Sequence, residues 1–353
     1  MSVIVDKKTA RKFFDNLYNS LIFIIFTVCL TAKLLQMNLL NFIEQYPDEE
    51  ACIERFKAQR EQNGIVCHKC GSRKHFWLKN KLSYECKHCH SRQSLRRGTV
   101  MEHSKLPFRY WFVSMHLLTG TKKSFSASEL QRQLGHKRFQ PIWEMLHKLR
   151  NVMGKRDNKY QLSGQVELDN AFITTLIPDD QKDEKLKRGA GSQNKSKVMV
   201  MTESTLVENP KPDKPPRRVN HIKMQIVLDL KADTATKIVK EQIDYHSDIQ
   251  SDDSTTYKKL NEVVQSHKAQ VIKHEDLSKV LPWVHICIGN VKRLLLDMHH
   301  QLKNEYLQYY LDEFCYKFNR RYFGEKMFDR LLMVATSYPT DFKSRIYNRT
   351  FCG

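Results

Sequence analysis

The stretch Cys67-His-Lys-Cys70, followed after the fifteen residues 71–85 by Cys86-Lys-His-Cys89, decides the fold of the first part of this chain. Each Cys-x-x-Cys pair can offer two thiolates from one tight turn, and two pairs complete the tetrahedral four-sulfur shell that suits Zn²⁺. A module this short buries little apolar surface, and metal binding therefore has to supply its folding free energy. In zinc-finger peptides that binding is worth about 10–16 kcal/mol. The spacing therefore predicts a zinc ribbon over residues 63–98, with a structural Zn²⁺.

The segment between the two cysteine pairs combines basic and aromatic side chains, as nucleic-acid-binding modules do. These side chains are Arg73, Lys74, Phe76, Trp77, Lys79, Lys81 and Tyr84. A histidine could replace one thiolate, and the candidates are His75, His88 and His90, although four well-spaced cysteines need no substitute. Free buried thiols, or a ribbon that only binds another protein, are the alternative interpretations.

The composition favours a polyanionic partner and a reducing compartment. The chain has 353 residues, enough for two or three domains, and its 59 Lys and Arg against 39 Asp and Glu give a net charge of +20. That charge suits DNA or RNA, although a ribosomal or membrane-surface protein could share it. Nine cysteines, an odd number, argue against a disulfide framework.

The N-terminus imitates a signal peptide or a short membrane anchor. Four cations within residues 7–12 precede an apolar run from Leu21 to Ala32. The twelve residues of this run are too few for a membrane-spanning helix, which needs about 20. We therefore expect no stable membrane association. Residues 1–37 are interpreted as an N-terminal extension, either a buried helix or sequence upstream of an alternative start at Met37.

Helices are predicted on both sides of the ribbon. Residues 38–62 form a helical lead-in. Within residues 99–155, Ser126 is a good N-cap with an acid three positions later, and Gly135 is a good C-cap. A second helix follows that glycine, with an apolar stripe from Pro141 to Leu149. This order predicts a helix-turn-helix DNA-binding region, although any helical hairpin shares the pattern.

From residue 164 onward the apolar residues follow the pattern of strands. Strand-like runs occupy residues 166–173, 197–201 and 223–230. Helical sequence is predicted after Tyr257 and again from Pro282. We therefore expect a mixed α/β domain over residues 160–330 and a C-terminal tail over residues 331–353.

The first of these strands carries an acidic residue at a costly position. Alternation places Asp169 on the face opposite to the apolar layer of Val166, Leu168 and Phe172. A carboxylate within a central strand is unfavourable unless it is paired or holds a cation. The alternative is an exposed carboxylate on an edge strand. Asp169 is thus a candidate ligand of a cation.

Two later segments carry the other candidate side chains. Asp252 lies in a polar turn, where an aspartate is usually only a helix cap. His285 and Lys292 are seven residues apart on a predicted helix, which places both on one side of it. A lone histidine at such a position would most often be structural.

Together these segments resemble the zinc-ribbon insertion-sequence transposases related to the Merlin superfamily, over roughly residues 38–330. The resemblance depends on six stretches in the same order. They are the ribbon with Gly98-Thr99, Ser126-Ala-Ser-Glu-Leu, Val166-Glu-Leu-Asp169, residues 187–198, Leu281-Pro-Trp-Val-His285 and residues 309–321.

The resemblance implies a ribonuclease-H-like catalytic domain that binds two divalent ions, Mg²⁺ or Mn²⁺, for DNA cutting and joining. Asp169 falls on the first acidic position of the family and Asp252 on the second. His285 falls on the third position, which is usually Glu but is His in one branch of the family, and Lys292 on the lysine seven residues later. These four residues are the implied catalytic set, and the first three are the implied ligands of the divalent ions.

Two departures from the family pattern concern this metal site. Asn170 stands where related sequences often carry a second acid, and His285 is a softer ligand than a carboxylate. They leave the preferred metal open and allow an alternative function, a catalytically inactive zinc-ribbon DNA-binding regulator derived from a transposase. Asn290 is the rival for the third position, and Asp229 or Glu167 could join the metal shell.

The sequence as a whole predicts a multidomain α/β protein, with a zinc ribbon and helix-turn-helix ahead of a ribonuclease-H-like mixed-sheet catalytic domain. The resemblance implies a DNA transposase that binds terminal inverted repeats and performs strand cleavage and strand transfer. Its partners would be double-stranded DNA and further copies of itself, in the bacterial cytoplasm at the nucleoid. A zinc-ribbon component of an RNA-processing or transcription assembly is a more distant alternative. The cations expected to contact DNA are Lys74, Lys79, Arg96, Arg97 and Arg138.

Overall fold

The computed structural model describes residues 38–210, 215–271, 280–299, 302–324 and 326–342. The expected N-terminal extension and the end of the expected tail, residues 343–353, lie outside the described residues. The chain divides into two compact units, Met1–Pro47 and Asp48–Gly353. In the first unit the structure describes α2 (Leu39–Gln45), whose N-terminus is capped by the side chain of Asn38.

Apart from the cysteine-containing segment, helices make up the first part of the second unit. They are α3 (Glu49–Gln62), α4 (Phe108–Gly120), α5 (Ala127–Leu134) and α6 (Phe139–Asp157), joined by α11 (Lys326–Ser337) from the end of the chain. Ser126 Oγ accepts the N–H of Glu129 at 3.1 Å, and α5 ends at Gly135, whose φ of 62° is left-handed. Both predicted ends of α5 are thereby confirmed. Within the described ranges, no helix is long and apolar enough to cross a membrane.

The expected C-terminal tail begins inside α11, which is packed rather than free. α11 contacts α3, α4 and α6, and the rings of Phe112 and Phe328 lie 5.8 Å apart. Leu331, Leu332 and Ala335 are fully buried. Their spacing from Phe328 is that of an amphipathic helix. The end of the chain therefore contributes to the core of the helical part.

The cysteine-containing segment forms a small antiparallel sheet in the order β1-β2-β3. Its strands are β1 (His75–Leu78), β2 (Ser83–Cys86) and β3 (Arg92–Ser94). Helix α3 lies against this sheet, with Lys57 Nζ 5.3 Å from the centre of the Trp77 ring. The guanidinium of Arg60 donates a hydrogen bond to the carbonyl of Leu95. Cation–aromatic and polar contacts therefore link the ribbon to α3.

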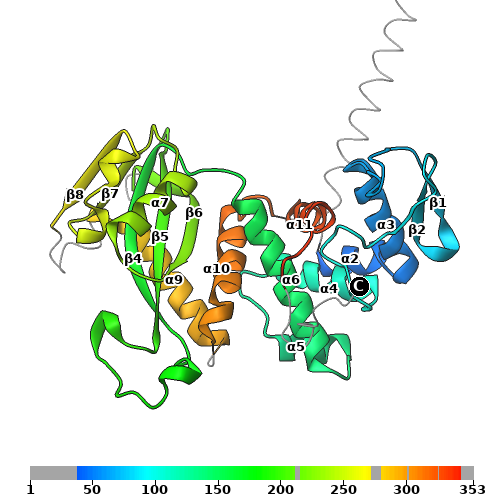
Figure 1. Cartoon of the computed structure of the whole chain (residues 1–353), viewed down its shortest axis with the longest axis horizontal. Helices are drawn as coiled ribbons and strands as arrows, with labels where there is room; N and C mark the ends of the chain where they lie inside the picture. The colour runs from blue at the N-terminus through cyan, green and yellow to red at the C-terminus, as the bar shows by residue number, and fades with distance from the viewer. Residues whose placement is uncertain (1–37, 211–214, 272–279, 300–301, 325, 343–353) are drawn as a thin grey trace, which may run out of the picture. The chain divides into compact units, whose positions relative to one another are not determined.

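A five-stranded mixed sheet, in the order β6-β5-β4-β7-β8, organises the rest of the second unit (Figure 1). Its antiparallel strands are β4 (Gln165–Thr174), β5 (Lys195–Leu206) and β6 (Arg217–Val227), which confirm the three predicted strands except for residues 228–230, which follow β6. After α7 (Ala232–Gln242), β7 (Asp248–Asp252) pairs in parallel with β4, and β8 (Ser266–Gln270) pairs in parallel with β7. Because β4 is central, Asp169 is not an exposed carboxylate on an edge strand.

Helices cover both faces of this sheet. Helices α9 (Pro282–Met298) and α10 (Asn304–Asn319) pack on one face, where Ala171 and Val284 share a buried cluster. Helix α7 packs on the other face, where Leu168 and Val239 share a second cluster. Asp169 does point away from the layer of Leu168, but alternation turns it towards the layer that α9 covers. Its carboxylate is therefore placed between the sheet and a helix.

The segment after Tyr257 differs from the prediction of a helix. It forms the short 3₁₀ turns Thr255–Tyr257 and Leu260–Glu262 and then strand β8. Leu260 and Val264 have helical spacing, but both are buried in the cluster beneath α7, at the point where the chain turns into the sheet. β8 is polar and largely exposed. Its strand conformation therefore depends on pairing with β7 and not on the burial of its own side chains.

Candidate active site and zinc site

The four cysteines of the ribbon converge. Their sulfur atoms all lie within 4.8 Å of one another, and the pairs Cys67–Cys89 and Cys70–Cys86 are each 3.5 Å apart. Hydrogen bonds accepted by the carbonyls of Cys67 and Cys86 close the two tight turns. Backbone N–H groups are the largest causes that lower the pKa values of Cys86 and Cys67, which favours their thiolates, whereas the pKa of Cys70 is raised by the neighbouring sulfur atoms. This four-sulfur shell fits a structural Zn²⁺.

The histidines near the ribbon stay outside this shell. His88 and His90 are exposed, and the ring of His75 lies edge-on to that of Tyr84, with centroids 6.3 Å apart. Within the described part of the chain, the group that gathers as a metal shell consists of the cysteines alone.

Four of the five cations expected to contact DNA are available to solvent. Lys74, Arg97 and Arg138 are exposed. Lys79 is also exposed, although its Nζ lies 2.8 Å from a carboxylate oxygen of Glu50. An exposed ion pair of this kind is weak and exchanges readily for a phosphate contact.

Arg96, the fifth cation, has an internal role. Its Nη1 donates a hydrogen bond to the carbonyl of Ser104 at 2.5 Å, and its guanidinium lies 4.3 Å from the centre of the Phe108 ring. Burial lowers the pKa of Arg96. Arg96 therefore holds the segment that follows the ribbon against the start of α4. These contacts do not favour a contact between Arg96 and a DNA phosphate.

Three of the four predicted catalytic residues lie close together at the centre of the mixed sheet, and Lys292 is near enough to Asp169 to lower its pKa. Asp169 is on β4, and Asp252 is the last residue of the adjacent β7, where the register pairs Leu168 with Ser251. His285 is in the first turn of α9, and its Nδ1 lies 3.5 Å from Asp169 Oδ2. Three segments distant in sequence thus bring two carboxylates and an imidazole together.

Burial and mutual repulsion shape the charges of this acidic cluster. Burial is the largest cause that raises the pKa of Asp169, and the charge of Asp252 adds to it. The N–H of Asn170, at 2.7 Å, and the charges of His285 and Lys292 oppose that rise. The pKa of Asp252 is also raised, again mainly by burial. Two half-buried carboxyl groups at close range are costly when ionised, and a bound cation would remove that cost.

Two buried atoms of the cluster lack partners among the described residues, Asp252 Oδ1 and His285 Nε2. Because His285 turns Nδ1 towards Asp169, its Nε2 remains available. Buried polar atoms without partners are rare in folded proteins, and a cation would satisfy both. Asp169, Asp252 and His285 are therefore candidates for holding a divalent ion, although among the described residues the cysteines alone gather as closely as a metal shell.

The rival ligands have other partners. Asn290 Oδ1 accepts a hydrogen bond from Arg293 Nη2 at 2.7 Å, and Asp229 Oδ1 accepts one from Thr234 Oγ1 at 2.7 Å. Glu167 Oε2 accepts backbone N–H groups of α9 at 2.8 and 2.9 Å. These contacts favour Asp169, Asp252 and His285 over all three rivals.

Tyr257 is a neighbour of the acidic cluster, and its sequence position gave no sign of a functional role. Its side chain is fully buried, and the charges of Asp169 and Asp252 add to burial in raising its pKa. The ring belongs to the apolar cluster on the α7 face. Tyr257 therefore supports β4 and β7 from behind the acidic cluster.

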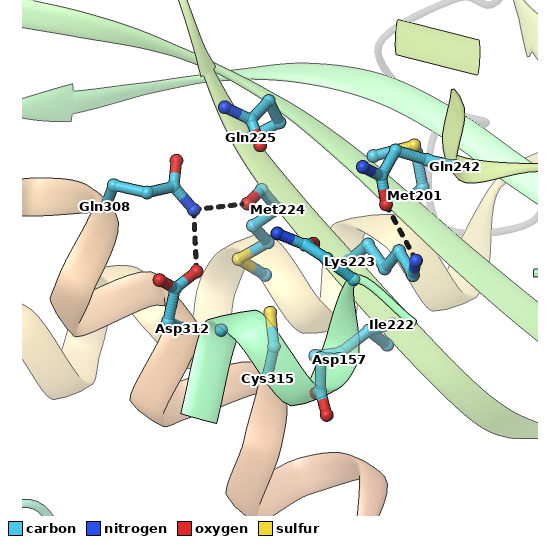
Figure 2. A pocket seen from close by; sticks show the side chains of 12 residues that line it. Asp157, Met201, Ile222, Lys223, Met224, Gln225, Gln242, Gln308, Asp312 and Cys315 are labelled. Atoms are coloured by element: carbon cyan, nitrogen blue, oxygen red, sulfur yellow. Dashed lines mark hydrogen bonds between the residues drawn. The ribbon is translucent and has the colours of Figure 1, made fainter. Parts of the chain in front are cut away.

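A second polar cluster lies between α6, β6 and α10 and lines a cavity of about 20 Å³, enough for about one water molecule (Figure 2). Asp312 Oδ1 accepts a hydrogen bond from Gln308 Nε2 at 2.8 Å, and the same nitrogen donates to Met224 O at 2.9 Å. Burial raises the pKa of Asp312 to about 7. Lys223 Nζ donates to Gln242 Oε1 at 2.7 Å. These contacts hold α10 and α7 against β6.

Gly154 of α6 is expected to tolerate no side chain at this cavity. An added Cβ would lie 2.2 Å from Asp312 Oδ2. Alanine normally stabilises a helix interior by about 1 kcal/mol relative to glycine. Here we expect Gly154→Ala to lower the free energy of unfolding by about 1–3 kcal/mol, as overpacking does. Urea-induced unfolding measures this, and combining the change with Asp312→Ala should recover much of the loss. An unchanged or higher stability would contradict the clash.

Two family models match the chain. The ISXO2-like transposase domain matches residues 161–319, which contain the mixed sheet, α9 and α10. The transposase zinc-ribbon domain matches residues 47–92. The ribbon, the mixed-sheet domain and these matches define a zinc-ribbon transposase. The chain belongs to the IS1595 family of such transposases, which confirms the resemblance in its sequence. A search of curated proteins finds no match.

Proposed function

We propose that this protein is a DNA transposase that binds the terminal inverted repeats of an insertion sequence and performs metal-dependent strand cleavage and strand transfer. The observation that carries the proposal is the meeting of Asp169, Asp252 and His285, with Asp252 Oδ1 and His285 Nε2 buried and unpartnered in the described chain. Such a set in a central sheet is suited to holding cations, and phosphodiester cleavage is a reaction that bound divalent cations promote.

In this proposal the chain's own residues hold the ions and the DNA. Asp169 would bind both ions, Asp252 would bind one of them, and His285 would complete the shell of the other or orient the attacking water. Two Mg²⁺ or Mn²⁺ ions bound there would activate water or a 3′ hydroxyl and relieve charge on the phosphate. Lys292, close enough to Asp169 to lower its pKa, would grip a phosphate beside the scissile bond as a point charge.

We assign the mixed sheet, within residues 160–330, to the ribonuclease-H-like class. Three antiparallel strands, a crossover through α7 and two parallel strands support this assignment. The candidate ligands lie on the two adjacent strands β4 and β7 and on α9, which comes after them in the chain. This placement brings the ligands together at one point of the sheet.

We assign DNA recognition to the ribbon and to α5 and α6 as a helix-turn-helix. The short turn between these two helices and the exposure of Arg138 at the start of α6 support this role. Lys74, Lys79 and Arg97 would add salt-sensitive phosphate contacts. Joining two transposon ends implies a homo-oligomer on DNA, located at the bacterial nucleoid.

A cleavage assay on end DNA tests the proposed function. The wild-type protein with Mg²⁺ or Mn²⁺ is expected to nick a labelled duplex that carries the inverted repeats flanking its own reading frame, and chelation should stop it. Binding to that duplex without cleavage would instead support the inactive regulator, which the changes at Asn170 and His285 allow. Equal binding to end DNA and scrambled DNA would exclude terminal-repeat recognition.

A further inference from the structure

Glu167 holds the first turn of α9 from a neighbouring strand. Its side chain is 7% exposed, and its Oε2 accepts the backbone N–H groups of Trp283 at 2.8 Å and Val284 at 2.9 Å. N–H groups in the first turn of a helix have no acceptor within that helix. The local N-cap residue, Leu281, makes no side-chain cap. Glu167 therefore acts as the cap of α9, from more than a hundred positions away in the sequence.

This cap lies beside the acidic cluster. Glu167 and Asp169 are on the same face of β4, about 7 Å apart along the strand. Asp169 Oδ2 faces His285, the residue that follows Val284 on α9, at 3.5 Å. Strand β4 and the first turn of α9 are thus joined by polar contacts through both carboxylates. The apolar packing between them is non-directional and does not by itself set their register.

The surroundings of Glu167 also separate it from the metal ligands. Glu167 and Trp283 line a cavity of about 210 Å³ that none of Asp169, Asp252 and His285 lines. The oxygen that α9 uses, Oε2, already accepts two hydrogen bonds. Glu167 is therefore placed to hold the helix.

We propose that Glu167 is a positioning residue: its carboxylate sets the register of α9 on β4, so that His285 and Lys292 face Asp169. The consequence for metal binding and cleavage rests on the proposed function. The alignment of α9 is a property of the free protein and can be tested without DNA.

Two variants of equal side-chain length test this role. Glu167→Gln keeps an acceptor oxygen for α9, whereas Glu167→Met keeps the length and loses the acceptor. In the Met variant we expect the amides of Trp283 and Val284 to exchange about tenfold faster. We expect Mn²⁺ affinity and the cleavage rate at saturating DNA to fall about tenfold or more, as outer-shell changes do. KM for DNA should change much less than the cleavage rate, because the contacts proposed for the ribbon and the helix-turn-helix are untouched and Lys292 alone would shift. The Gln variant should recover most of each loss.

The other outcomes are also decisive. Equal exchange and equal Mn²⁺ affinity in the Gln and Met variants would overturn the proposal, and loss of one bound Mn²⁺ per chain in both would make Glu167 a ligand instead. If the Met variant does not fold, exchange in the wild-type protein decides, since unprotected amides at Trp283 and Val284 would rule out the cap. If the wild-type protein cleaves no DNA, the proposed function fails, while exchange and Mn²⁺ binding still report on Glu167.

Discussion

Asp169→Ala is expected to abolish metal-dependent cleavage of end DNA while DNA binding is retained. Asp169 contacts His285 and is close enough to Asp252 for that charge to raise its pKa, and in our proposal it binds both divalent ions. Stabilisation of transition-state charge by metal ions is worth several kcal/mol, and each 1.4 kcal/mol is about a factor of ten in rate. We therefore expect the rate to fall at least about a thousandfold.

The assay compares variants on the same labelled duplex with Mn²⁺ at saturating protein. Asp229→Ala is the matched control, because Asp229 is an acid two residues after β6 whose carboxylate accepts hydrogen bonds from Thr234 and from the backbone of Lys231. It should cleave within about threefold of wild type, as surface changes away from a site do. Fluorescence anisotropy should give similar affinities for all three proteins. Cleavage by Asp169→Ala at the control rate would remove Asp169 from the reaction.

Local chemistry made the ribbon and the strands predictable. The spacing of the four cysteines directly indicates the ligands of a tetrahedral site, and in the structure their sulfur atoms lie close together. The ends of α5 were predictable because Ser126 and Gly135 act within one turn of the helix. Strand β4 followed from alternation in a short window of sequence. Each of these features depends on residues that are close in the chain.

Features that depend on tertiary pairing were harder to predict. Strand β8 has little apolar alternation of its own, and only its pairing with β7 makes it a strand. Asp252 and His285 were suggested by the resemblance, since a polar turn and a lone histidine carry no sign of their meeting. The cap by Glu167 was missed because its partners, Trp283 and Val284, are brought to it only when α9 docks on β4. The one local sign of this role in the sequence was the acidic residue two positions before Asp169.

Loss of zinc is expected to unfold the ribbon and leave the mixed sheet folded. The ribbon has a three-stranded sheet and few apolar side chains, so zinc binding worth about 10–16 kcal/mol dominates its stability. The two buried clusters around the mixed sheet contain no residue of the ribbon, so they do not depend on the metal. Cys86→Ser, or a strong chelator, should therefore expose strands β1 to β3 to hydrogen exchange while β4 to β6 stay protected.

Zinc content and exchange together measure this effect. Cys52→Ser is the control, because Cys52 is buried in α3 and burial raises its pKa to about 12, so it remains a thiol outside the metal shell. The wild-type protein and this control should hold about one Zn²⁺ per chain, and Cys86→Ser should hold much less. End-DNA binding should fall with the metal if the ribbon reads the repeats. Full zinc content in Cys86→Ser, or an ordered ribbon without zinc, would mean that contacts with α3 suffice to fold it.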